Sequence, residues 1–255
     1  MKTTPKSACE TCVHHSLDGV KKLGVDISNV DFVIALAGNP NTGKSTVFNA
    51  LTGLRQHTGN WPGKTVTRAE GAFEYQQKKF KLIDLPGTYS LMSRSEDEEV
   101  ARNFILFGKP NVTIIVVDAS RLERNLNLTL QILEITSNAV LCLNLMDEAA
   151  KNNIDIDTRS LSKELGIPVV ATSARSKEGI PELIATVSDV AMSKIICKPH
   201  KIKNIPPQLE AAIKKLSTAI KNQYPTVSNS RWLAFRVLEG DTHIIEALKN
   251  GNFSS

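Results

Sequence analysis

The sequence predicts an α/β protein, in which a mostly parallel sheet with covering helices is followed by a small all-helical domain. Short apolar runs of strand type alternate with helical patterns from about residue 31 to residue 193, as expected for successive βαβ units. Residues 198–207 contain three prolines that no helix would tolerate, and they end this alternation. Beyond them, only helical apolar spacing follows.

We expect strands at 31–37, 66–75, 79–84, 112–118, 139–144 and 168–172. We expect helices near 44–54, 96–107, 121–136, 157–165 and 178–193, and in the tail at 208–222, 229–239 and 241–250. The runs 66–75 and 79–84 are predicted to form an antiparallel hairpin at the sheet edge. Residues 55–65 contain two glycines and a proline, and are predicted to form an irregular loop that acts as a switch.

These patterns predict three regions along the chain. Residues 1–29 are expected to be a flexible N-terminal extension, 30–195 the α/β domain, and 196–255 the helical domain. Residues 194–255 carry ten Lys/Arg against four Asp/Glu. This positive charge either is a solvated surface or attracts an anionic membrane or an acidic partner.

The first strand and the first helix are joined by a phosphate-binding pattern. Residues 38–45 read Gly-Asn-Pro-Asn-Thr-Gly-Lys-Ser, which is the spacing G-x-x-x-x-G-K-S. Glycines let such a loop wrap around phosphates, while its amides and the helix N-terminus face the anion. Lys44 is expected to reach the β- and γ-phosphates, and Ser45 to ligate Mg²⁺. The nucleotide-binding residues predicted here are Gly38, Asn39, Pro40, Asn41, Thr42, Gly43, Lys44, Ser45 and Thr46.

The strand at 79–84 runs into a second motif of the D-x-x-G type. It consists of Asp84, Leu85, Pro86 and Gly87. Asp84 ends a strand and can hold Mg²⁺ through water, and the Gly87 N–H can meet the γ-phosphate. The position of this motif, about forty residues after the phosphate loop, supports its assignment to the nucleotide site.

The base is predicted to be guanine. The strand at 139–144 ends in Asn144, Leu145, Met146 and Asp147. One carboxylate can accept both the N1–H and the 2-amino group of guanine, whereas adenine lacks this pair of donors. Asp147 is therefore assigned to base recognition and Asn144 to bracing the pocket. The segment Thr172, Ser173 and Ala174 can offer a backbone N–H to the guanine 6-oxo group.

The four motifs in this order resemble those of the translation-factor-like small GTPases, which implies a P-loop GTPase fold. The segment 51–66, which contains Gly-Asn-Trp-Pro-Gly, narrows the family. With the first two motifs and the run 117–126, it resembles the cytosolic N-terminal G domain of the FeoB family of bacterial ferrous-iron transport proteins. The resemblance is strong over residues 30–190 and looser over the helical tail.

The resemblance implies a GTPase that converts GTP to GDP and phosphate, with some ATP hydrolysis left open. It places Gly63, Lys64 and Thr65 of the switch loop at the nucleotide, with Mg²⁺ held by Ser45, Thr65 and Asp84. The residue after Gly87 is Thr88 instead of the Gln that Ras-like proteins use to orient water. In the FeoB family a phosphate-loop Asn binds K⁺, and Asn41 occupies that position. The catalytic residues implied are Lys44, Thr65, Gly87 and Asn41.

The same resemblance implies a role in ferrous-iron transport at the cytoplasmic face of the bacterial inner membrane. The expected partners are guanine nucleotide, a membrane-embedded iron-permease domain that normally belongs to the same chain, and small accessory transport proteins, but no nucleic acid. The chain itself is expected to be soluble, because no run of 18 apolar residues exists. It is interpreted as an excised portion or a stand-alone relative.

Two other functions remain open. One is a ribosome-assembly or tRNA-modifying GTPase, although the tail lacks a G-x-x-G clamp. The other is a regulatory switch that binds GTP with little turnover.

The N-terminal extension contains a cluster of Cys and His. Cys9, Cys12, His14 and His15 could ligate Zn²⁺ or Fe²⁺, but so short a stretch closes poorly around one ion. The alternative is a flexible leader with reduced thiols.

Overall fold

The computed structural model describes residues 19–21, 23–53, 56–92, 95–200, 206–225, 227 and 229–249. The chain divides into two compact units, one ending at Pro199 and the other beginning at His200. Within the described ranges, no helix is long and apolar enough to cross a membrane.

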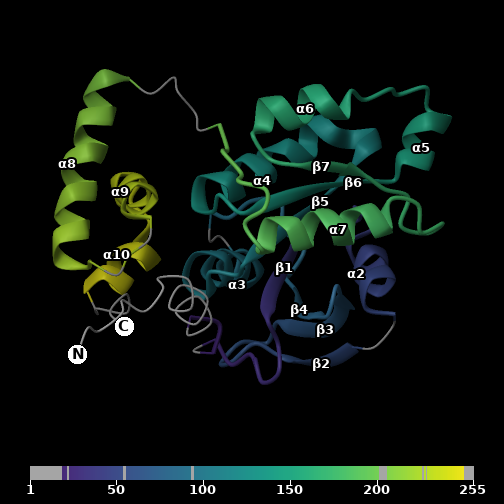
Figure 1. The fold of residues 1–255 in the computed structure, drawn as a ribbon. Helices are drawn as coiled ribbons and strands as arrows, with labels where there is room; N and C mark the ends of the chain where they lie inside the picture. Colours follow the sequence, from purple (N-terminus) through teal and green to yellow (C-terminus); the bar gives the residue numbers. More distant parts are fainter. Residues whose placement is uncertain are drawn as a thin grey trace, which may run out of the picture. The chain divides into compact units, whose positions relative to one another are not determined.

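The first unit is built on one seven-stranded sheet, in the order β2-β3-β4-β1-β5-β6-β7 (Figure 1). The strands are β1 Phe32–Gly38, β2 Gln56–Asn60, β3 Thr67–Tyr75, β4 Lys78–Asp84, β5 Val112–Asp118, β6 Ala139–Asn144 and β7 Val169–Ala171. Strands β4, β1, β5, β6 and β7 run parallel, whereas β2 and β3 pair antiparallel. The predicted α/β fold with a mostly parallel sheet is confirmed.

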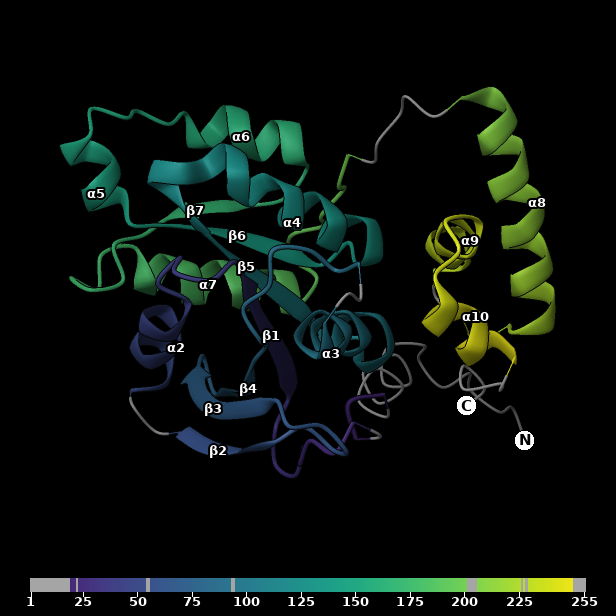
Figure 2. The same ribbon diagram turned by 180° about the vertical axis from the view of Figure 1, so that it is seen from behind.

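Helices cover both faces of this sheet. They are α2 Lys44–Thr52, α3 Glu96–Asn103 with the π-helix η1 Phe104–Gly108, the 3₁₀ turn η2 Ala119–Arg121, α4 Leu122–Ile135, α5 Met146–Lys151, α6 Thr158–Leu165 and α7 Ile180–Ala191. Helices α2 and α7 pack on one face, and α3 and α4 lie on the other (Figures 1 and 2). Every residue of β1, β5 and β6 is buried. Burial on both faces explains why these strands read as continuous apolar runs.

The prediction of an irregular loop over 55–65 is wrong in part, because β2 occupies five of these residues. Residues of β2 pair with β3 in register, from Gln56 opposite Gly71 to Asn60 opposite Thr67. Gly and Asn are poor strand formers, but the ladder offered by β3 overrides that preference. The predicted hairpin of β3 and β4 is antiparallel as expected. Its position at the edge is wrong, since β2 forms the edge strand.

Two other elements differ from the sequence expectation. The helix expected to run to residue 107 ends as α-helix at Asn103 and continues as a π-helix to Gly108. Helix α5 follows Leu145 directly and was not predicted, because its six residues are too few to show a periodic pattern.

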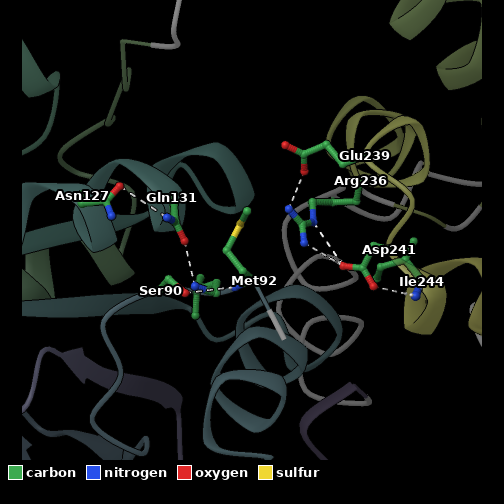
Figure 3. A network of polar contacts seen from close by, with 9 residues as sticks. Ser90, Met92, Asn127, Gln131, Arg236, Glu239, Asp241 and Ile244 are labelled. Carbon is green, nitrogen blue, oxygen red and sulfur yellow. Dashed lines mark hydrogen bonds and ion pairs between the residues drawn. The ribbon is translucent and has the colours of Figure 1, made fainter. Parts of the chain in front are cut away.

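The second unit contains α8 Pro207–Gln223, α9 Ser230–Leu238 and α10 Thr242–Lys249, which confirms the predicted small helical domain. Its core includes Ile213, Leu233 and Ile244. The buried Arg236 is paired with Glu239 and with Asp241, whose second oxygen accepts the Ile244 N–H at the start of α10 (Figure 3). This ion cluster joins α9 to α10.

Candidate functional site

The phosphate loop connects the end of β1 to the start of α2. The Thr42 hydroxyl is buried and donates to the Asn39 carbonyl at 2.9 Å, which tightens the turn. Gly43 occupies the N-cap with φ 77°, and the first turn of α2 begins Lys44-Ser45-Thr46 without an acidic residue. The amides at this helix end are therefore available to an anion.

Lys44 and Asp84 come together because β1 and β4 are neighbouring parallel strands. Leu36 of β1 lies opposite Asp84 in the register. The Lys44 ammonium forms an ion pair with the Asp84 carboxylate, and both side chains are more than four-fifths buried. Burial raises the pKa of Asp84 above its ordinary value, and the Lys44 charge and hydrogen bond oppose this shift.

The loop after Asp84 is tied to the phosphate loop and to α4. The Thr88 N–H donates to the Gly38 carbonyl at 3.3 Å, and the Thr88 side chain is buried. Farther along, the Leu91 N–H donates to Gln131 Oε1 at 2.7 Å, and the Gln131 amide contacts Asn127 (Figure 3). Gly87 lies beside Pro40 of the phosphate loop.

Asn144 connects the phosphate loop to the loop after β7. Its Nδ2 donates to the Thr42 carbonyl at 2.9 Å across 102 residues of chain. Its Oδ1 accepts the Ala174 N–H at 3.0 Å and the Thr172 hydroxyl at 3.2 Å. Asn144 is 1% exposed, so these contacts are shielded from water. The bracing role expected for this residue has a geometric basis.

Gly43 permits this arrangement in two ways. Its φ of 77° is left-handed, which favours glycine. In addition, a Cβ at residue 43 would lie 2.4 Å from Asn144 Nδ2, far inside contact distance. Any larger residue here would displace the Asn144 amide.

The predicted base-recognition residues form one loop cluster. Leu145 adopts φ 62° as the N-cap of α5, and the Met146 N–H donates to the Thr172 carbonyl at 3.2 Å. The Asp147 N–H donates to Ser173 Oγ at 3.3 Å, while the Asp147 side chain is exposed. A backbone N–H of Ser173 or Ala174 was expected to meet the guanine 6-oxo group, and both already donate, Ser173 to the Glu178 carbonyl and Ala174 to Asn144. A base would have to share or replace one of these hydrogen bonds.

Two asparagines of the phosphate loop differ in environment. Asn41 is exposed with φ 65°, a conformation that Asn tolerates better than most residues. Asn39 is 3% exposed, and neither atom of its side-chain amide has a hydrogen-bond partner in the described part of the chain. The left-handed backbone by itself accounts for an Asn at 41.

We define the switch segment as residues 61–66, the turn between β2 and β3. The Thr65 hydroxyl donates to Glu96 Oε2 of α3 at 3.0 Å, and Lys64 Nζ lies 3.0 Å from Glu99 Oε2. Gly63 has φ 69° in this turn. Glu96 and Glu99 were not identified from the sequence, because acidic residues at the start of a helix are common.

The structure thus brings Gly38–Thr46, Asp84–Gly87, Asn144–Asp147 and Thr172–Ala174 to the carboxyl edge of the sheet. Within the described ranges, no group of three or more His, Cys, Asp or Glu that could hold a metal ion is found. The proposed ligands Cys9 and Cys12, with His14 and His15, lie outside the described residues.

Two protein-family models match this chain. Residues 32–187 match the model described as ferrous iron transport protein B, and residues 206–254 match the FeoB cytosolic helical domain. The "Fe(2+) transporter FeoB" of Methanocaldococcus jannaschii is 47% identical over 220 residues, which are 86% of this chain and 32% of that protein. The chain therefore spans about a third of the length of this curated relative.

Solved structures agree with this match. The cytosolic domain of T. maritima FeoB in apo form has a TM-score of 0.78 and 38% identity, covering 86% of this chain and 85% of that one. The same domain in its GDP form I has a TM-score of 0.78 and 39% identity, covering 86% and 84%. Since the first family model spans more than half of the sequence, the chain belongs to the FeoB family of ferrous iron transport proteins.

Proposed function

We propose that this chain is the GTP-binding and GTP-hydrolysing module of a FeoB-type iron transporter. The observation that carries the proposal is Asn144, whose buried amide links the phosphate loop to the loop that would hold the base. The T. maritima cytosolic domain with GDP has the same fold at 39% identity. Both support a guanine nucleotide at the carboxyl edge of the sheet.

In the proposed complex, the Lys44 ammonium exchanges its pairing with Asp84 for the β- and γ-phosphates. The amides at the start of α2 and the Gly87 N–H donate to phosphate oxygens. Asp147 accepts the two guanine donors, and its exposed side chain makes it accessible to the base. Asn144 holds the two loops together.

The residues present suit Mg²⁺, a hard cation that prefers oxygen ligands. The Ser45 hydroxyl is exposed at the start of α2, and Asp84 offers a carboxylate once Lys44 turns to phosphate. Thr65 would complete the set from the switch segment. The bound ion would neutralise phosphate charge. The exposed Asn41 amide oxygen also suits K⁺, which would add positive charge near the phosphates.

Water positioning is assigned to the backbone of the switch segment. Thr88 is buried and its N–H is bonded to Gly38, so it holds the loop in place instead of orienting water. The same observation favours a second candidate, a switch that binds GTP and turns it over slowly.

The proposed setting is the cytoplasmic face of the cell membrane, where GTP turnover would gate or regulate ferrous-iron passage. The M. jannaschii relative, of which this chain covers 32%, is named an Fe(2+) transporter, and this name supports a membrane permease domain as the partner. Small accessory transport proteins are further proposed partners.

The test is phosphate release from GTP and from ATP, with Mg²⁺, in K⁺ and in Na⁺ buffers. We expect GTP turnover that is faster in K⁺ and lost in Lys44→Ala. Asn41→Ala should lose K⁺ stimulation yet bind GDP. Tight GTP binding without turnover would favour the slow switch. Co-purification with RNA would favour the ribosome-assembly or tRNA-modifying alternative. Equal GTP turnover rates in the K⁺ and Na⁺ buffers would contradict the proposed role of K⁺.

A further inference from the structure

The start of α3 contacts the switch segment through two carboxylates. Glu96 accepts the Thr65 hydroxyl and Glu99 pairs with Lys64, each at 3.0 Å. The helix begins there because Ser95 Oγ accepts the Glu98 N–H as an N-cap. The four acidic residues of the first turn therefore include two that hold a neighbouring loop.

The strand register places the switch segment at the nucleotide edge of the sheet. Asn60 lies opposite Thr67 where the turn begins, and Ala69 of β3 lies opposite Asp84, the last residue of β4. The turn therefore extends past Asp84, on the side of the sheet edge where the phosphate loop also lies. Thr65 is at the correct edge for a metal ligand, yet its hydroxyl is bonded to α3.

One end of the switch segment is anchored more firmly than the other. Trp61 is 4% exposed, packs edge-on against Phe104 at 5.3 Å between ring centroids, and lies under the Arg68 guanidinium. Thr65 and Glu96 are exposed. Exposed contacts of this kind are weak and readily exchanged, whereas burial of an indole ring is costly to reverse. The segment can release its Thr65 end while Trp61 stays in place.

We propose that Glu96 and Glu99 are positioning residues that hold Thr65 on α3 in the absence of nucleotide, so that binding of GTP with Mg²⁺ must break both contacts. This rests on the proposed function, in which Thr65 is a Mg²⁺ ligand. If a ligand binds only a minor conformation of the protein, its apparent affinity is reduced in proportion to the population of that conformation. Loss of a contact to α3 should therefore strengthen binding.

The test measures the affinity of the full chain for a non-hydrolysable GTP analogue with Mg²⁺, and for GDP with a chelator. Glu96→Ala should bind the analogue about three- to tenfold more tightly, with GDP affinity unchanged within about twofold. Glu99→Ala should act in the same direction with a smaller gain. Asp97→Ala is the matched control, because Asp97 is an exposed carboxylate in the same turn.

A double-mutant cycle separates positioning from simple charge removal. In a Thr65→Ala background, Glu96→Ala should no longer strengthen analogue binding, because the hydroxyl that it held is gone. An equal gain in both backgrounds, or a gain of equal size in Asp97→Ala, would overturn the proposal. If Glu96→Ala does not fold, as judged by circular dichroism, Glu99→Ala carries the same test.

Failure of the proposed function has a different signature. If the parent chain binds the analogue no better with Mg²⁺ than with chelator, or if Thr65→Ala leaves the Mg²⁺ dependence intact, Thr65 is not a metal ligand and both proposals fail. Normal Mg²⁺ dependence with unchanged affinity in Glu96→Ala and Glu99→Ala would overturn the positioning role alone.

Discussion

Two parts of the proposed nucleotide site are held together by different kinds of contact. Asn144, 1% exposed, joins the phosphate loop to the loop after β7 through buried hydrogen bonds. The switch segment is held at Thr65 and Lys64 by contacts with α3 that water reaches. Buried hydrogen bonds are costly to leave unmade, whereas exposed ones exchange with water at little cost. The contacts of Asn144 are therefore preorganised, whereas the switch segment can rearrange at its Thr65 end at little cost.

The strongest test of the preorganised part is Asn144→Ala. The Thr42 carbonyl and the Ala174 N–H would both lose a buried partner. We expect a loss of about 4 kcal/mol in the free energy of unfolding, from two unsatisfied groups. Urea denaturation of the nucleotide-free chain measures this. The control is Asn127→Ala, an exposed amide on α4; equal losses in the two variants would refute a special role for the brace.

Asp147→Asn tests whether the Asp147 carboxylate selects the base without contributing to the stability of the fold. Removing the carboxylate should weaken GTP binding by about 3 kcal/mol. The free energy of unfolding should not change, because the side chain is exposed. Xanthosine triphosphate should compete better in the variant. Glu148→Gln, at the adjacent exposed position, is the control for titration calorimetry, and unchanged GTP affinity in Asp147→Asn would remove the guanine assignment.

The thiol of Cys142 probes the buried core beneath the loop after β7. Its Sγ lies 3.2 Å from Thr172 Oγ1, and burial raises its pKa to about 12 from an ordinary value of 9.0. Since the pKa is raised in the folded state, stability is retained below pH 9.0 and is lost as pH rises toward 12. The parent should lose about 1 kcal/mol more than Cys142→Ala between pH 9 and 10, because half of the unfolded thiols are already ionised at pH 9.

Unfolding curves of both proteins at pH 8, 9 and 10 check this difference. At pH 8 the folded parent should also leave Cys142 unlabelled by maleimide until urea is added, as peptide mapping would show. Parallel pH dependence of parent and variant would mean that the thiol ionises freely in the folded state.

The smallest effect is expected at the switch segment. Glu99→Gln removes the charge that pairs with Lys64. The free energy of unfolding should fall by less than about 1 kcal/mol, as is usual for ion pairs that water reaches. Thermal unfolding at low and high salt would detect it. A loss comparable to that of Asn144→Ala would erase the distinction between the two parts of the site.

The features that were predictable from the sequence depend on local chemistry. The apolar run of β1, the glycine-rich loop and the start of α2 lie within 21 consecutive residues, and each carries its own signal. Strand β2 was missed because His57-Thr-Gly-Asn60 acquires its extended form only through β3. Helix α5 was missed because it is too short for periodicity.

The site residues also divide into those with a local sequence signal and those whose contacts depend on tertiary packing. Asn144 could be singled out from its place at the end of a strand, but its contact with Thr42, 102 residues away in the chain, was not predictable. The pairing of Thr65 with Glu96 was not predictable, because the first turn of α3 reads as an ordinary acidic helix start. Motifs predict which residues would meet a ligand, but tertiary packing decides what those residues contact in this structure.

The close approach of Gly43 to Asn144 has a consequence for how this sequence tolerates change. A methyl group at residue 43 would lie 2.4 Å from the Asn144 amide nitrogen. A single substitution there would disturb the phosphate loop and the hydrogen bonds of Asn144 together, although residues 43 and 144 are about a hundred residues apart in the sequence. A laboratory library that varies residues 43 and 144 separately should therefore return almost no functional members outside the parental pair.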